Sequence, residues 1–196
     1  GTNTAPTLDG TPIADAAALS GFTGTALDTA TATPTTVSTT GTATIEDGAA
    51  VSYPITANAI EISNATVNDT GSLTADTINV TGTLTNNGTI NATTSTTVAD
   101  GGSLANTGSF ITAAMTVNGD GSSNDGTMNI TGTLTIANGK TMTANAGTMT
   151  IGTVAFGDNT SKLARTAGAT INVTTVTVDG APSDTNDTNV FPNGKI

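Results

Sequence analysis

The chain has 196 residues, of which 48 are threonine, 23 glycine and 19 asparagine, and its formal net charge is −11. Cysteine and histidine are absent, which excludes zinc-finger sites, thiol nucleophiles and Ser-His-Asp triads. With four basic and 15 acidic residues, the composition argues against a nucleic-acid partner. The sequence contains no run of 18 apolar residues and therefore predicts no membrane-spanning segment.

Residues 1–50 are poor in large apolar side chains, with only seven Leu, Ile, Val or Phe residues. Residues 31–44 are rich in β-branched threonine and contain Pro34, whose nitrogen has no hydrogen to donate to a neighbouring strand. This composition predicts an edge strand or a strap. We therefore expect residues 1–50 to form an extended N-terminal arm.

Residues 51–180 form the predicted body, an all-β repeat region. Apolar and polar residues alternate there in short segments, as in Ile78/Val80 and Met128/Ile130. Alternation with period two is typical of half-buried strands, and Asn-Gly and Asp-Gly turn signals separate the segments. Residues 181–196 form a polar tail, which we expect to be a C-terminal cap or a docking tail.

The body contains internal repeats. The segment TINVTGTLT (77–85) recurs as TMNITGTLT (127–135), and TINVT returns at 170–174. Apolar residues fall every five to eight positions between these segments. If each coil of a solenoid contains three such positions, this spacing predicts a coil of roughly 18–22 residues. This spacing favours a parallel β-solenoid in which threonine and asparagine stack on like residues of adjacent coils, forming hydroxyl and amide ladders.

An antiparallel β-sandwich or jelly roll is the alternative architecture. A three-residue loop at Asn87-Gly88 with a left-handed glycine places Leu84 opposite Ile90, so both side chains share one buried face. Hairpins are therefore compatible with the sequence, although the repeat spacing favours the solenoid.

The segments GTLTNNGTINA (82–92) and GTLTIANGKTMTA (132–144) resemble the repeats of β-helical bacterial surface proteins of the adhesin and autotransporter-passenger type. The resemblance covers roughly residues 58–180 and does not include the predicted arm. It implies an extracellular structural or adhesive role.

Two kinds of non-catalytic site are candidates. Oxygen-bearing side chains at alternate positions of residues 118–126 are typical of calcium loops, which makes Asp120, Asn124 and Asp125 candidate calcium ligands. Asn-x-Ser/Thr sequons are candidate N-glycosylation sites. They lie at Asn64, Asn68, Asn79, Asn87, Asn91, Asn129, Asn159, Asn172 and Asn186.

We expect a non-enzymatic, extracellular subunit of a self-assembling surface filament, held together by strand exchange between copies. No lysine or arginine occurs in the first 139 residues, so an acidic N-terminal half can attract the less acidic C-terminal end of a neighbour in a head-to-tail homopolymer. The alternatives are an adhesin or glycan-binding β-helix module that binds surface glycans and, second, a polysaccharide-active enzyme. The enzyme is disfavoured because the chain has only two glutamates and few aromatic side chains for a sugar cleft.

Overall fold

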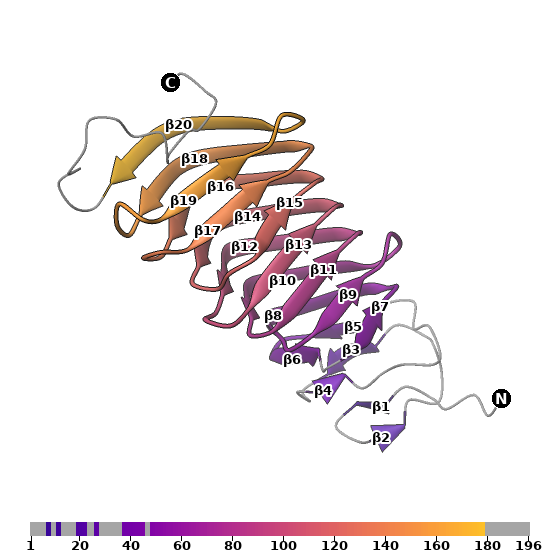
Figure 1. The fold of residues 1–196 in the computed structure, drawn as a ribbon. Helices are drawn as coiled ribbons and strands as arrows, with labels where there is room; N and C mark the ends of the chain where they lie inside the picture. Colours follow the sequence, from indigo (N-terminus) through magenta and orange to yellow (C-terminus); the bar gives the residue numbers. More distant parts are fainter. Residues whose placement is uncertain are drawn as a thin grey trace.

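The chain forms a parallel β-solenoid of about seven turns, with no helix in the described residues (Figure 1). The computed structural model describes residues 7–8, 11–12, 19–22, 26–27, 37–45 and 48–178, with side chains described for 37–45 and 48–177. No helix that is long and apolar enough to cross a membrane occurs among these residues.

Two parallel sheets share the coils. The first contains the long strands β8 (Pro54–Ile62), β10 (Ser72–Val80), β12 (Thr89–Val98), β14 (Ser109–Val117), β16 (Thr127–Ile136), β18 (Thr148–Phe156) and β20 (Thr170–Val178). The second contains the short strands β7 (Ala49–Val51), β9 (Ala65–Val67), β11 (Thr83–Asn86), β13 (Ser103–Asn106), β15 (Ser122–Asn124), β17 (Thr141–Ala144) and β19 (Lys162–Arg165). Each coil supplies one strand to each sheet.

Every strand pair within residues 48–178 is parallel, so the antiparallel sandwich alternative is wrong. The repeat length agrees closely with the predicted coil. In-register residues are separated by 17 positions from Leu73 to Ile90 and by 22 positions from Met149 to Ile171.

Each long strand bends in the middle and faces the core twice. In β10 the side chains of Leu73 and Ala75 are buried, Asp76 and Thr77 are exposed, and Ile78 and Val80 are buried again. Two exposed neighbours shift the period-two alternation by one residue, so both halves of the strand bury their apolar side chains. With the short strand, each coil therefore has three core-facing segments.

Like side chains stack along the core. The last inward position of the long strands carries, in register, Ile62, Val80, Val98, Val117, Ile136 and Phe156, all of them buried. Strands in a sheet are only about 4.8 Å apart, so like side chains, five aliphatic and one aromatic, contact one another along this column.

A glycine follows the short strand in successive coils because the backbone turns there against the preceding coil. A Cβ atom on Gly108 would lie 2.2 Å from the carbonyl oxygen of Gly88, and one on Gly126 would lie 2.2 Å from that of Gly108. The same carbonyls accept hydrogen bonds from Ser109 N and Thr127 N, both at 2.9 Å. Any larger residue would break this backbone ladder.

The stack begins before residue 51, where we expected the arm to end. Strands β5 (Val37–Thr39) and β6 (Thr42–Ile45) pair in parallel with the two halves of β8 and so add a coil. Strands β3 (Leu19–Phe22) and β4 (Ala26–Leu27) pair in parallel with β5 and β6, and β1 (Thr7–Leu8) pairs antiparallel with β2 (Thr11–Pro12) and β4. The predicted tail, residues 181–196, lies outside the described residues.

Candidate functional site

An asparagine ladder runs through the core at the end of three short strands. Asn86, Asn106 and Asn124 have fully buried side chains. Asn86 Nδ2 donates to Asn106 Oδ1 at 2.7 Å, and Asn106 Nδ2 donates to Asn124 Oδ1 at 2.6 Å. The predicted amide ladder is therefore confirmed.

The ladder ends where the register brings in an apolar side chain. Asn86 is aligned with Val67 in the preceding coil, and Asn124 is aligned with Ala144 in the following one. Since Val67 has no donor, the buried Asn86 Oδ1 has no hydrogen-bond partner. A buried acceptor in this state reduces the stability of the fold.

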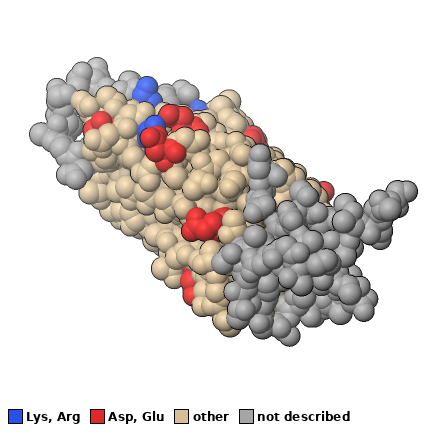
Figure 2. Space-filling view, turned by 90° about the horizontal axis from the view of Figure 1, so that it is seen from below, with Lys and Arg blue, Asp and Glu red and all other residues tan. Residues whose placement is uncertain are grey.

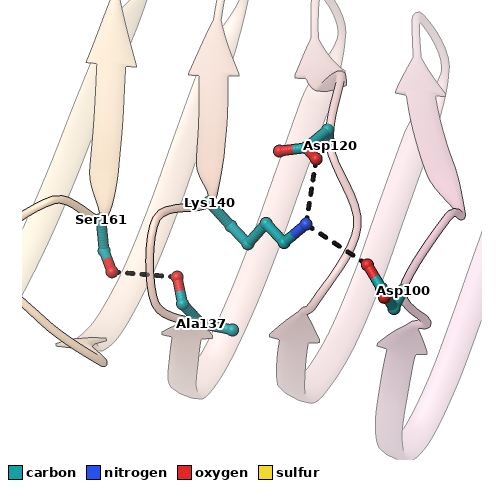
Figure 3. A network of polar contacts seen from close by, with 5 residues as sticks. All are labelled: Asp100, Asp120, Ala137, Lys140 and Ser161. Atoms are coloured by element: carbon teal, nitrogen blue, oxygen red, sulfur yellow. Dashed lines mark hydrogen bonds and ion pairs between the residues drawn. The ribbon is translucent and has the colours of Figure 1, made fainter.

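A lysine joins the turns of three successive coils (Figure 3). Lys140 Nζ lies 2.9 Å from Asp120 Oδ2 and 3.3 Å from Asp100 Oδ1. The hydrogen bond to Asp120, followed by that to Asp100, raises the pKa of Lys140. Both carboxylates are largely exposed, so water screens the ion pairs, and the one positive charge of Lys140 offsets only part of the negative charge of the two turns.

The structure does not bring the candidate calcium ligands together. Asp120 is paired with Lys140, and the amide of Asn124 lies within the core ladder. Asp125 is exposed and accepts a hydrogen bond from Asn145 Nδ2 at 3.3 Å. Among the described side chains, no group of three or more acidic residues is arranged to hold a metal ion.

The turn between β18 and β19 is organised by one carboxylate. Asp158 Oδ1 accepts hydrogen bonds from the hydroxyl and the amide of Thr160, from Ser161 and from Gly139 N. These bonds, that of the Thr160 hydroxyl above all, lower the pKa of Asp158 to about 2. The Ser161 hydroxyl also donates to Ala137 O at 2.9 Å, which connects this turn to the preceding one (Figure 3).

The outer surface has few charges. The strands β12, β14, β16, β18 and β20 contain no ionisable side chain, and the charged residues of these coils lie in turns and in β19. Figure 2 shows the acidic and basic atoms as small groups on an otherwise uncharged surface. One outward column runs through Ser72, Thr89, Ser109, Thr127, Thr148 and Thr170.

A shallow hollow lies outside the short-strand sheet near its N-terminal end. It has a volume of about 220 Å³, and its lining includes Ala50, Thr66 and Thr85. No acidic or aromatic side chain lines it, so it lacks the groups that a polysaccharide-active enzyme requires.

Within the described part of the chain, the C-terminal end of the solenoid is an edge without a further strand. Among the described residues, β20 pairs only with β18, and β19 pairs only with β17. Ile171, Val173 and Val176 are only partly buried, although their in-register counterparts in β18, one coil earlier, are at most 1% exposed. This edge and the neutral faces are the features that a partner would meet.

The predicted glycosylation sites occupy different environments. Asn68 donates to Ser52 Oγ and Asn79 to Glu61 Oε2, while Asn64 and Asn87 accept hydrogen bonds. Asn159 has a polar partner as well, and Asn186 lies outside the described residues. The remaining three sequon asparagines, Asn91, Asn129 and Asn172, lie in the long strands β12, β16 and β20.

Comparison of the chain with protein-family models, with curated proteins and with solved structures finds no match.

Proposed function

We propose that this chain is a structural subunit of an extracellular fibre, in which copies join end to end by strand addition at β20. The observation that carries the proposal is the open edge of β20, with its partly covered Ile171, Val173 and Val176. A strand edge of nine residues has backbone groups ready to pair with another chain, and exposed edges promote such pairing.

The distribution of charge supports a head-to-tail arrangement. Residues 1–76 contain eight acidic residues and no lysine or arginine. Lys162 and Arg165 lie in β19, the last strand of the second sheet, at the same end of the solenoid as β20 (Figure 1). Residues 140–196 contain four basic and four acidic residues, so an acidic N-terminal part and a less acidic C-terminal part favour the contact of unlike ends over that of like ends.

The N-terminal segment of the next copy is the proposed donor. Residues 37–45 are paired with β8, a strand of the solenoid body, so the donor role is assigned to residues 1–36. Strands β3 and β4 of this segment would exchange their pairing with β5 and β6 for pairing with β20 of the neighbouring copy. Repetition of one heterologous contact produces an open fibre. The resemblance of the GTLT segments to bacterial surface repeats supports the extracellular placement.

A pair of lysine variants tests the proposal. Val176 faces the core at the open end and Thr177 faces solvent, so Val176→Lys and Thr177→Lys add the same charge to opposite faces of β20. We expect wild-type protein and Thr177→Lys to form fibres in electron micrographs, and Val176→Lys to remain monomeric in sedimentation. Circular dichroism verifies that both variants fold.

Deletion of residues 1–36 is the second test, since it leaves β5 and β6 in place. We expect soluble monomers that retain the β-sheet spectrum. Wild-type protein that stays monomeric at all concentrations, or fibres that persist in both Val176→Lys and the deletion, would contradict the proposal.

A further inference from the structure

We propose that Asn91, Asn129 and Asn172 are N-glycosylation sites, which together place a stripe of glycans along one face of the solenoid. Each begins an Asn-x-Thr sequon within a long strand. The inference rests on the extracellular placement proposed above and is independent of fibre assembly.

The register places the three residues in one outward column. The column runs, strand by strand from β10 to β20, through Thr74, Asn91, Ile111, Asn129, Thr150 and Asn172. The sequons therefore alternate with other residues and occur in every second coil. Two coils correspond to about 9.6 Å, which gives each glycan twice the lateral space that adjacent strands would offer.

The local conformation exposes both functional groups of each sequon. The middle residue points inward, as Ala92 and Ile130 do in the first two sites. The threonine follows at the exposed corner of the long strand, where Thr93, Thr131 and Thr174 lie. The asparagine and the threonine hydroxyl thus lie on the same outward side of the strand, where the Thr93 hydroxyl donates to Asp76 Oδ1 at 2.7 Å.

The amides of these three asparagines are available, whereas those of other sequons are engaged. Asn91, Asn129 and Asn172 make no side-chain hydrogen bond with any residue that the structure describes. Asn79, by contrast, lies outward near the end of β10 and donates to Glu61 Oε2 at 2.7 Å, and the hydroxyl of its sequon residue Thr81 donates to Ile62 O at 3.1 Å. Asn79 is therefore an internal control with an engaged sequon.

An exposed apolar side chain between two of the sites supports the same inference. Ile111 is 39% exposed and is the one large hydrophobic residue that is exposed among the described side chains. It lies in register between Asn91 and Asn129. Glycans on both neighbours would cover it with the apolar faces of their sugar rings and remove it from water.

The modification is a glycosyl transfer from a lipid-pyrophosphate-linked oligosaccharide, catalysed by an oligosaccharyltransferase. The asparagine Nδ2 forms a bond to the anomeric carbon of the sugar as the bond from that carbon to the phosphate oxygen breaks. The lipid pyrophosphate leaves with the electron pair, and the amide loses one proton to a base of the transferase. No oxidation or reduction is involved.

Glycopeptide mass spectrometry of the protein purified from its native source tests the inference. Because the first 139 residues contain no lysine or arginine, the digestion must cut at acidic residues. We expect glycan on Asn91, Asn129 and Asn172. Occupancy at Asn79 should be lower by a factor of about ten or more, since a hydrogen bond to a charged group corresponds to roughly 10- to 150-fold.

A variant expressed in the same cells gives the second readout. Thr131→Val removes the hydroxyl of one sequon but keeps Asn129, so the intact mass should fall by one glycan, and Thr150→Val should leave the mass of glycan unchanged. Bare asparagine at the three sites, equal occupancy at Asn79, or an unchanged glycan mass in Thr131→Val would overturn the inference. None of these outcomes depends on whether the protein forms fibres.

Discussion

The asparagine ladder makes a quantitative prediction about two substitutions that look alike in sequence. Asn106→Ala removes the central residue, and with it both ladder hydrogen bonds. Asn124→Ala removes the terminal residue and only one of them. Both variants also lose two hydrogen bonds from Nδ2 to backbone carbonyls, so these losses cancel when the variants are compared.

The difference between the two variants follows from the remaining contacts. Asn106→Ala loses one additional hydrogen bond, worth about 1 kcal/mol, and leaves the buried Asn124 Oδ1 without a donor, which costs about 1–3 kcal/mol. Asn124→Ala leaves no ladder acceptor unpaired, because only Asn106 Nδ2 loses a partner and it retains two carbonyl acceptors. The free energy of unfolding should therefore fall by about 2–4 kcal/mol more in Asn106→Ala than in Asn124→Ala.

Equilibrium unfolding in urea, followed by circular dichroism, measures this difference. The dependence of the unfolding free energy on urea concentration should be the same in wild type and both variants. Stacked repeats can unfold in stages, and a changed slope would reveal such staged unfolding. Equal destabilisation by Asn106→Ala and Asn124→Ala would refute the reasoning, because it would mean that the ladder bonds and the unpaired acceptor contribute nothing measurable.

Three further outcomes are expected. Val67→Thr places a hydroxyl in register with the unpaired Asn86 Oδ1, so the unfolding free energy should change by less than about 1 kcal/mol. Val154→Thr buries a hydroxyl among apolar side chains, so it should lower the unfolding free energy by about 1–3 kcal/mol in the same urea experiment. The pKa of Asp158 is lowered to about 2 by hydrogen bonds that favour its ionised form, so its contribution to stability is present above the unfolded pKa of 3.8 and is lost as the pH falls towards 2. Asp158→Asn should remove that part of the pH dependence of the thermal midpoint. Burial raises the pKa of Tyr53, the only tyrosine, to about 12, so its phenolate absorbance should titrate near pH 12 in the folded protein and near pH 10 after unfolding. The contribution of the buried neutral phenol to stability is complete below pH 10 and decreases as the pH rises through 12. A tyrosine midpoint near 10 in the folded state would contradict its burial.

The solenoid was predictable because its dominant signal is local. Alternation such as Met128/Ile130 identifies a strand without knowledge of its partners, and the spacing of apolar residues, with three positions per turn, gives the coil length. The bend within each long strand also has a local signal, since two adjacent outward residues, Asp76 and Thr77 in β10, separate the two apolar pairs.

The inward direction of the ladder asparagines was not predictable from residue type. Asparagine is common in turns, and Asn86 and Asn106 each precede an x-Gly turn, so their position suggests an exposed role. The usable signal is their spacing: each lies two residues after a buried leucine, Leu84 or Leu104, and therefore points to the same side of the strand. Only the register between coils then shows that one amide can bond to the next.

The N-terminal boundary was misjudged for a related reason. Residues 37–45 contain few large apolar side chains, which indicated an arm. The inward positions are nevertheless occupied by Val37, Thr39, Ala43 and Ile45, all buried. In a narrow core, an alanine or threonine in register with a larger residue fills an inward position, so large apolar content underestimates how far the stack extends.

The same geometry explains why the ends of the solenoid matter more than its faces. In a stacked array each coil contacts only its neighbours, so stability is close to a sum of nearest-neighbour terms. An internal coil such as that of β14 has two neighbours, whereas the coil of β20 has one among the described residues, and its Ile171 and Val176 remain partly exposed. Addition of a further strand would complete the burial of those side chains and pair the free backbone groups in a single step. An uncharged outer surface provides no comparable gain, because its hydroxyl and amide groups are already solvated. The free energy available for assembly is therefore concentrated at the edge of β20, which is why the proposed contact between copies is axial rather than lateral.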